Sequence, residues 1–246
     1  MIDYFVFGNV DTRDYDMYVY DKDSDSVSPW EYSVQSIPGR NGDILIPQKR
    51  IPNAINTYNV ILADNADSNF KSFKDDIFAQ IGYQRLEDSF HTTEFYQAYC
   101  SDAITPIIDK TRRMIKFQIV FSRKPQRFLK SGETVQVFTG NIISISNPTR
   151  NNSLPLIKLT ASARTTAGTI TINGNSISLS SFTDFLYIDI ETMEAGKYYI
   201  GDASNLIKFA SFNQDDYSLL SGQNEIRLNN LSNVSSVEIT PRWWIK

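Results

Sequence analysis

The segment Phe117–Gly132 (FQIVFSRKPQRFLKSG) constrains the fold most, because the chain changes character there. An alternating strand pattern runs into a basic turn that contains Pro125. Aromatic and charged residues crowd the sequence before this turn, and short segments rich in Ser, Thr and Asn follow it. A chain of 246 residues also exceeds the usual size of one domain. We therefore predict two domains, residues 1–131 and 132–246, with a short junction near Lys130–Gly132.

Most of the periodic segments of the chain alternate between apolar and polar residues, as β-strands do. The odd-numbered positions of Ile115–Phe121 are all Ile or Phe, and their neighbours are mostly polar, which indicates a half-buried strand. Tyr58–Leu62 and Phe95–Tyr99 are expected as partner strands. Short strands without helices fill the second half, which favours an antiparallel sandwich. The predicted class is mainly β: an α+β N-terminal domain with one helix on a sheet, followed by a β-sandwich.

One segment, near residues 68–82, has the spacing of an amphipathic helix. Its apolar positions are Phe70, Phe73, Ile77, Phe78 and Ile81. Ser68 is the expected N-cap and Gly82 the expected residue after the last turn. We expect this helix to lie over a sheet by its aromatic face.

Two Asn-Gly pairs, which are strong turn signals, predict hairpins. The first lies in Gly39–Asp43, between Tyr32–Ile37 and Ile44–Ile46, and Pro38 and Pro47 bracket it. This segment is expected to form a projecting hairpin or arm. The second is Asn173-Gly174, whose composition suits a type I′ turn.

Composition excludes several classes of protein. The formal net charge of −4 argues against non-specific electrostatic binding of nucleic acid. Cys100 is the only cysteine, so an intramolecular disulfide and a cysteine-based zinc site are both excluded. The N-terminus lacks the charged region of a signal peptide, and no apolar run approaches the length of a membrane span. We expect a protein that is made in a cytosol, stays soluble and does not bind membranes.

Enzymatic and metal-binding motifs receive little support. His91 is the only histidine, and no G-x-S-x-G or phosphate-binding loop occurs, so His91 is expected to be structural. Cys100 ends an aromatic strand-like run, where a buried, inert thiol is expected. Asp21, Asp23 and Asp25 imitate the start of an EF-hand loop. The match fails because Ser and Tyr stand where that loop requires Gly and Glu. The sequence therefore predicts no enzyme, no metal and no cofactor.

Two further clusters allow a functional and a structural interpretation. Basic residues gather around the midpoint, at Lys110, Arg112, Arg113, Lys116, Arg123, Lys124, Arg127 and Lys130. A protein interface is favoured over nucleic acid, since the whole chain is acidic. Aromatic side chains that sugars stack on occur at Trp243, Trp244, Tyr198 and Tyr199. Adjacent strand positions face opposite ways, however, so one Trp is expected inside and one outside.

Taken together, three regions resemble the distal tail protein family of long-tailed, non-contractile bacteriophages. IPGRNGDILI (Ile37–Ile46) resembles the family's N-terminal arm, and FSRKPQRFLKSGE (Phe121–Glu133), centred on Lys124 and Pro125, resembles its domain junction. The C-terminal run from SNPTRNNSLPLIKL to SSVEITPRWWIK resembles its second domain. Arg123 and Gln126 depart from the pattern, because a small residue and an aromatic are common there.

The resemblance implies a structural role without enzymatic activity. In this family the N-terminal domain forms a hexameric ring between the tail tube protein and a tail-tip or tail-associated lysin-type protein, and leaves a central channel for DNA. The C-terminal domain is a galectin-like sandwich outside the ring, where receptor-binding proteins attach. The implied location is the distal end of the phage tail, in the virion.

Ring closure requires two different complementary patches on each subunit. We hypothesise that Arg40, Asn41, Gly42 and Asp43 reach a neighbouring subunit, because their turn signal lies between two prolines. The alternative function is a carbohydrate-binding module for host cell-wall polysaccharide. Galectins bind sugars with a cluster that includes His, and residues 132–246 contain none.

Overall fold

The computed structural model describes residues 3–22, 26–63, 65–111, 113–196, 207–211 and 213–246. Its contacts divide the chain into two compact units, residues 1–127 with Lys246, and residues 128–245. The boundary between 131 and 132 that the sequence predicts lies a few residues beyond this division. Each unit is described by itself.

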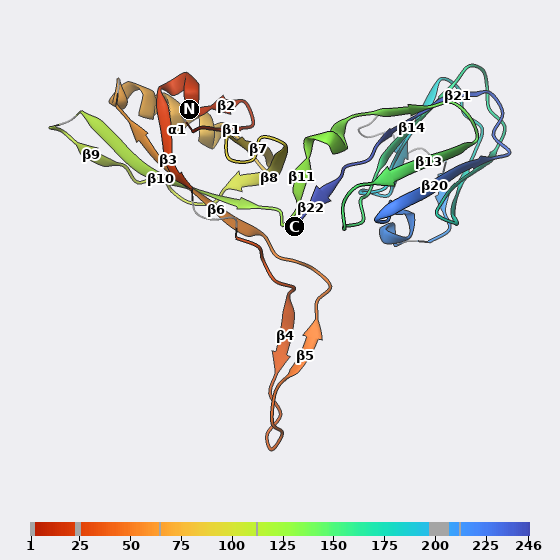
Figure 1. The fold of residues 1–246 in the computed structure, drawn as a ribbon, viewed down its shortest axis with the longest axis horizontal. Helices are drawn as coiled ribbons and strands as arrows, with labels where there is room; N and C mark the ends of the chain where they lie inside the picture. Colours follow the sequence, from red (N-terminus) through yellow and green to blue (C-terminus); the bar gives the residue numbers. More distant parts are fainter. Residues whose placement is uncertain (1–2, 23–25, 64, 112, 197–206, 212) are drawn as a thin grey trace. The chain divides into compact units, whose positions relative to one another are not determined.

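A large antiparallel sheet forms the N-terminal unit (Figure 1). Its strands run in the order β2-β1-β7-β8-β10-β6-β3, and β9 pairs with β10. Their bounds are β1 Phe5–Phe7, β2 Val10–Asp11, β3 Met17–Lys22, β6 Ala54–Leu62, β7 Gln84–Asp88, β8 Glu94–Cys100, β9 Ile107–Asp109 and β10 Met114–Arg123. A 3-10 turn, Thr12–Tyr15, joins β2 to β3. Both predicted partner strands, β6 and β8, pair with β10.

The helix α1, Ala66–Ala79, covers one face of this sheet (Figure 1). Within the described residues it is the only α-helix. Phe73 and Ile77 are fully buried, and the rings of Phe70 and Phe73 lie 5.2 and 5.7 Å from that of Phe117. The predicted buried face is confirmed at Phe73 and Ile77, whereas Phe78, which the spacing also placed on it, is 48% exposed.

Both predicted ends of the helix were wrong. Asn65, not Ser68, is the N-cap. The helix ends at Ala79, and the backbone of Gln80, two residues before Gly82, is already extended. Ile81 consequently lies outside the helix and is 87% exposed. Its helical spacing is a coincidence, because the chain has already left the helix when it reaches this residue.

Aromatic side chains fill the core between α1 and the sheet. The ring of Phe5 lies 4.9 Å from Tyr58 and 5.4 Å from Phe121, and Phe7 lies 4.8 Å from Phe121. The Ile and Phe residues at odd positions of 115–121 are all buried, whereas Lys116 and Gln118 are exposed. Burying each large apolar side chain stabilises the fold by about 1.5–3 kcal/mol. The predicted half-buried strand is confirmed.

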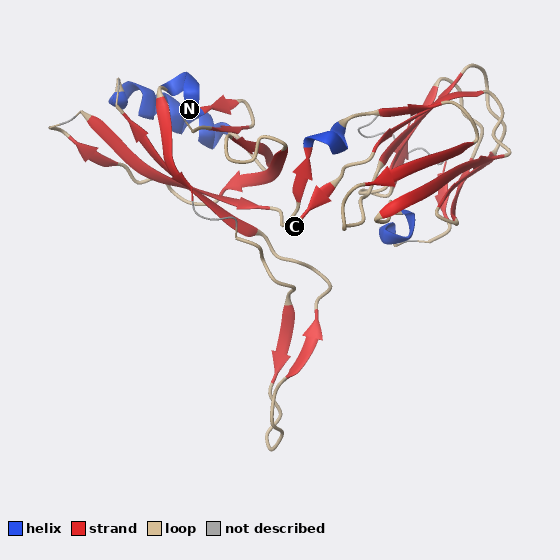
Figure 2. Cartoon of the chain, in the orientation of Figure 1, coloured by secondary structure: helices blue, strands red, loops and turns tan. Residues whose placement is uncertain are grey.

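The C-terminal unit is a sandwich of two five-stranded antiparallel sheets, in which strands predominate (Figure 2). One sheet has the order β12-β21-β14-β17-β18: Gln136–Phe138, Val234–Thr240, Leu156–Ala161, Phe185–Asp189 and Glu194–Gly196. The other has the order β13-β20-β15-β16-β19: Ile142–Asn147, Gly222–Asn229, Gly168–Ile172, Asn175–Leu179 and Ile207–Phe209. Outside these sheets lie the paired strands β11, Arg127–Leu129, and β22, Trp244–Ile245, and the 3-10 turns Lys130–Glu133 and Gln214–Tyr217. The predicted mainly β class is confirmed.

Inward-facing Ile and Leu residues of both sheets make one core, which Trp243 also joins. Trp243 is buried, whereas Trp244, the first residue of β22, is half-buried, so the outside position expected for one Trp is only partly realised. Asn173 and Gly174 have φ of 48° and 94°, which fits the expected type I′ hairpin between β15 and β16. A Cβ on Gly132 would lie 2.2 Å from the backbone nitrogen of Trp243, so glycine is required at this close approach.

Candidate functional site

The most unusual exposed element of the N-terminal unit is the segment Glu31–Arg50, which we call the arm. Its strands β4, Tyr32–Gln35, and β5, Ile44–Pro47, form a separate two-stranded antiparallel sheet (Figure 1). From residue 32 to residue 50 every residue is exposed except Ile44, which is half-buried. A two-stranded hairpin alone is only marginally stable in water. The arm therefore has the features of a segment that another surface completes.

One face of the arm is entirely apolar. Tyr32 pairs with Pro47, and Val34 pairs with Leu45. Residues that lie opposite each other in an antiparallel pair share a face, so these four side chains form one surface, the apolar arm face. Val34 and Leu45 are 61% and 58% exposed. Such an exposed apolar surface marks a contact site.

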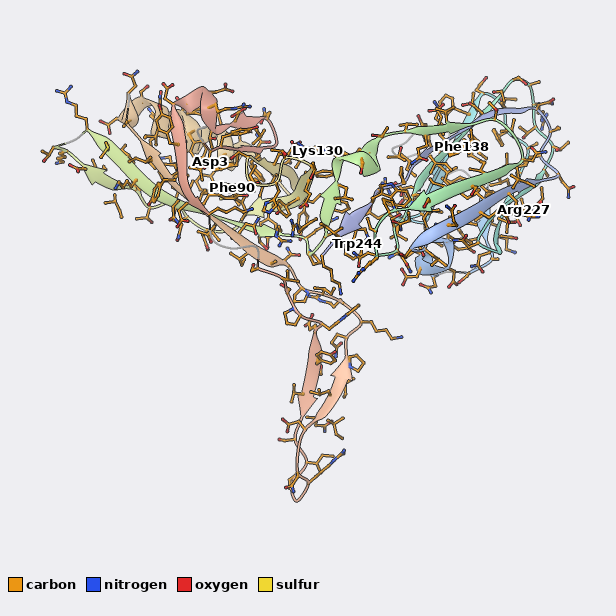
Figure 3. The ribbon with its side chains drawn as sticks, in the orientation of Figure 1. Asp3, Phe90, Lys130, Phe138, Arg227 and Trp244 are labelled. Carbon is orange, nitrogen blue, oxygen red and sulfur yellow. The ribbon has the colours of Figure 1, made fainter. Side chains whose placement is uncertain are left out.

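The other face of the arm is mixed. Ser33 pairs with Ile46, and Gln35 pairs with Ile44, so each polar side chain lies beside an isoleucine. Figure 3 shows side chains standing out on both sides of β4 and β5. The two faces differ in polarity, which gives the arm a preferred side for an apolar contact.

The four predicted contact residues lie together in the loop at the tip of the arm. Gly39 and Gly42 have φ of 81° and 80°, which lets the chain reverse there. Arg40 N–H donates to the carbonyl of Ile37 at 3.1 Å. Arg40, Asn41, Gly42 and Asp43 are all exposed. Their contact with a neighbouring subunit stays a prediction.

Hydrogen bonds tie the root of the arm to β6. Ser26 Oγ donates to the carbonyl of Ile55 at 2.7 Å, and Ser28 Oγ donates to that of Asn53 at 3.0 Å. Across the root, Glu31 N–H donates to the carbonyl of Arg50 at 3.0 Å. The arm thus begins and ends at a defined place on the sheet.

Arg123 strengthens this root from inside the unit. Its side chain is almost completely buried, and Nη2 donates to the carbonyl of Ser26 at 2.8 Å. Nε donates to Asn56 Oδ1 at 3.0 Å, and the guanidinium lies 4.7 Å from the centre of the Tyr96 ring. The sequence placed Arg123 in a basic run and did not predict its burial, because its partners are distant in sequence.

The predicted junction residues follow directly after β10. Lys124 N–H donates to the carbonyl of Gln97 at 2.8 Å, and both Lys124 and Pro125 are half-buried. Two residues later Arg127 Nε donates to Glu94 Oε2 at 2.8 Å. The chain is therefore held to β8 until the N-terminal unit ends.

A second exposed apolar patch lies beside the root, on the sheet. By register Ile55, Ser122 and Tyr99 form one row across β6, β10 and β8, and the ring of Tyr83 lies 5.4 Å from that of Tyr99. Asn53 Nδ2 donates to Tyr83 Oη at 2.7 Å and to Ser122 Oγ at 3.0 Å. We call these residues, Asn53, Ile55, Tyr83 and Tyr99, the root patch.

His91 belongs to a polar cluster around the buried carboxylate of Asp88. Lys22 Nζ and Tyr58 Oη donate to Asp88 Oδ2 at 2.8 and 2.7 Å, and the N–H groups of Phe90 and His91 donate to Oδ1. Burial and the Asp88 charge raise the pKa of Tyr58 well above its usual value. These four hydrogen bonds give Asp88 the role of a structural carboxylate that fixes the turn after β7.

The other candidate sites are dispersed. In the described part of the chain, no group of three His, Cys, Asp or Glu residues is placed to hold a metal, and Asp23 and Asp25 lie outside it. Cys100 is half-buried rather than buried, and burial raises the pKa of its thiol. Among the described residues no helix is long and apolar enough to cross a membrane.

The basic residues around the midpoint do not share one face. Lys110, Arg113 and Lys116 are exposed, whereas Arg123 is buried. Arg112 lies outside the described residues. This division does not provide the continuous charged surface that nucleic acid requires.

The second sheet of the sandwich gives little support to sugar stacking. The outward residues of its second sheet are mostly small, polar or charged, such as Thr171, Ser178 and Arg227, apart from the exposed Ile142, and none of the described ones is aromatic. Trp244 Nε1 donates to the carbonyl of Asn152 at 2.7 Å. Tyr198 and Tyr199 lie outside the described residues.

Comparisons with known proteins identify the fold. No protein-family model matches the sequence, and no curated protein matches it significantly. Among solved structures, the chain is similar to the Dit protein of phage SPP1, described as a paradigm of the hub adsorption apparatus in phages that infect Gram-positive bacteria. The TM-score is 0.69 at 11% identity, over 97% of this chain and 98% of that one. A chain of the phage P2 baseplate is also similar, with a TM-score of 0.50 at 12% identity, over 97% of this chain and 98% of that one. The resemblance to distal tail proteins is thus confirmed at the level of the fold.

Proposed function

We propose that this chain, which has the fold of a phage distal tail protein, is a structural component of a long, non-contractile tail. The observation that carries the proposal is the extent of the likeness to the SPP1 hub protein, which includes both units over 97% of the chain. Fold alone does not define function, so a second feature is needed. The exposed apolar arm supplies it, because a solitary protein gains nothing from such a face.

In this proposal the N-terminal unit assembles into a hexameric ring at the distal end of the tail. One side of the ring contacts the tail tube protein, and the other contacts a tail-tip or tail-associated lysin-type protein. The central hole serves as the channel for DNA. The sandwich lies outside the ring as a galectin-like domain to which receptor-binding proteins attach, and the protein catalyses no reaction.

Assembly rests on the arm. A ring is closed by one heterologous interface repeated around an axis, so each subunit presents an arm and a different surface that receives it. The tip residues Arg40, Asn41, Gly42 and Asp43 and the apolar arm face extend to the neighbouring subunit.

Negative-stain electron microscopy of the purified protein tests this function. Six-fold rings with a central hole are expected, and their proportion should rise with protein concentration, because a ring held between two partners in the virion is weaker alone. Light scattering on the same samples gives the mass. A monomer at all concentrations up to the solubility limit would refute the proposed ring.

A further inference from the structure

We infer that Asn41, at the tip of the arm, is a site of spontaneous covalent modification, where the side-chain amide is lost and an aspartate or isoaspartate residue forms. The reacting groups are the backbone nitrogen of Gly42 and water, so no enzyme is required. The inference rests on a comparison of the two Asn-Gly pairs of the chain, which lie in opposite environments. It does not depend on the proposed ring, because each chain reacts by itself.

The reaction is an attack of the backbone on the preceding side chain. The nitrogen of Gly42 forms a bond to Cγ of Asn41, the bond from Cγ to Nδ2 breaks, and the proton of the attacking nitrogen leaves with the amide group as ammonia. Water then opens the resulting succinimide ring at either carbonyl group, which gives aspartate or isoaspartate. One water molecule is consumed for each ammonia released. Glycine favours this attack because no side chain shields its nitrogen.

Nothing in the described part of the chain restrains the amide of Asn41. The residue is exposed, and no hydrogen bond or ion pair holds its side chain. Gly42 lies beyond the pairing of β4 and β5, which ends at Gln35 and Ile44. A Cβ on Gly42 would have no heavy atom within 4 Å, so the space around the attacking residue is open. The side chain can therefore turn toward the nitrogen.

The second pair, Asn173-Gly174, is held in place. Asn173 is half-buried, and its Nδ2 donates to the carbonyl of Ser218 at 3.2 Å and to Asn224 Oδ1 at 2.7 Å. Its Oδ1 accepts from the N–H of Glu225 at 3.1 Å. Both ends of this amide are thus fixed, and Cγ cannot turn toward the Gly174 nitrogen unless these three hydrogen bonds break.

The cost of releasing Asn173 determines the expected difference in rate. Exposed loops without buried contacts open at almost no cost in free energy, whereas a site held by several hydrogen bonds must first open. We therefore expect Asn41 to react at least about ten-fold faster than Asn173 in the folded protein, because three hydrogen bonds must break at the second site.

The modification changes both the charge and the backbone of the arm tip. Arg40 and Asp43 carry opposite charges on either side of the Asn41-Gly42 pair. The product adds a second carboxylate close to Asp43, so the tip becomes negative. Isoaspartate also carries the main chain through its Cβ, which lengthens the backbone by a carbon atom. In the proposed ring, an aged subunit would present an altered tip to its neighbour.

Peptide mapping of the full chain tests the inference. The protein is incubated for days at 37 °C and pH 8, at a concentration where light scattering shows a monomer, and circular dichroism checks that it stays folded. Digestion at acidic pH limits further reaction. The peptide with Asn41 should gain about 1 Da and separate into aspartate and isoaspartate forms. The peptide with Asn173 should be at least about ten-fold less modified.

Two controls separate the effect of structure from that of local sequence. In concentrated urea the hydrogen bonds of Asn173 are lost, so both pairs should react at rates within about three-fold of each other. Asn41→Gln keeps an amide at the tip but cannot form the five-membered ring with the next residue. Its peptide should keep its mass over the same period.

The outcomes separate this inference from the proposed function. Equal rates at the two pairs in the folded protein would overturn the inference, and so would a modified Asn41 peptide without isoaspartate. A rate at Asn41 at least ten-fold lower in the folded monomer than in urea would also overturn it, because the tip would then protect its amide. A protein that reacts at Asn41 but never forms rings would support the inference and refute the ring.

Discussion

The guanidinium of Arg242 holds the carboxylate of Asp189 through two hydrogen bonds, of 2.7 and 2.9 Å, inside the C-terminal unit. Burial acts to raise the pKa of Asp189, but the hydrogen bonds and the charge of Arg242 outweigh it and hold this pKa below its usual value. A carboxylate with a lowered pKa stabilises the fold above its unfolded pKa, near 3.9. That stabilisation disappears as the pH falls through the lowered pKa.

Asp189→Asn should lower the free energy of unfolding at pH 7 by about 1–3 kcal/mol, because it removes the carboxylate that binds the partly buried Arg242 through two hydrogen bonds and leaves only the longer, 3.3 Å pair with Glu191. The loss should shrink as the pH falls below 4, where the native carboxylate becomes protonated. Urea unfolding from pH 7 to pH 3 measures both effects. Glu225→Gln is the matched control, since the Glu225–Arg227 pair is exposed and its loss should leave the unfolding midpoint unchanged. Equal losses at pH 7 and pH 3 would contradict this role of Asp189.

Arg123→Ala should lower the free energy of unfolding by about 3 kcal/mol, because it leaves a cavity and removes donors from buried acceptors. Arg123→Lys should recover only part of this, since an ammonium group does not reproduce the fork of guanidinium donors. Hydrogen exchange should also accelerate near Ser26 and Asn56, which lose their hydrogen bonds. Lys116→Ala, on the exposed face of the same strand, should change the free energy by less than about 0.5 kcal/mol. Unchanged exchange at the root would show that Arg123 does not hold the arm.

Deletion of Gly39–Asp43 should leave a folded protein that no longer forms rings, because this loop is exposed and, in the proposed ring, contributes to the subunit contact and not to the core. Circular dichroism checks the fold, and light scattering with electron microscopy measures assembly. Replacement of Ser178 by Ala, on the outer face of the sandwich, is a control that should assemble normally. Rings that persist after the deletion would show that the tip residues make no necessary contact.

Gly132→Ala should lower the free energy of unfolding of the C-terminal unit by about 1–3 kcal/mol or more, since the new methyl group would overlap the backbone at Trp243. Thermal unfolding followed by tryptophan fluorescence should show a midpoint several degrees lower. Ser131→Ala tests the neighbouring exposed position and should have little effect. A wild-type midpoint for Gly132→Ala would mean that the backbone relaxes at no cost.

The sequence predicted those features that depend on local pattern. Alternation along residues 115–121 and the Asn-Gly turn at 173–174 involve neighbours in the chain, and the structure has both. The predicted C-terminal end of the helix was wrong because Ile81 keeps the helical spacing although the backbone is already extended at Gln80. Local pattern cannot show where tertiary contacts stop a helix.

The candidate site was predictable only in part. Prolines and glycines indicated the arm, but its apolar face depends on the register of β4 and β5, and its root depends on β6. Arg123 looked like one member of a basic run, because its partners Ser26 and Asn56 are 97 and 67 positions away. The root patch joins residues of two strands and two loops, so nothing in any single segment reveals it.

In the proposed ring, the two serine hydroxyl groups at the root of the arm, Ser26 and Ser28, would affect assembly before any partner arrives. Since they fasten the first leg to the sheet, a free subunit samples fewer arm directions than one with a loose hinge. The entropy lost on docking is correspondingly smaller, and capture of the next subunit should be faster. Two weak hydrogen bonds, remote from the contact itself, would thus adjust how quickly a tail tip is completed.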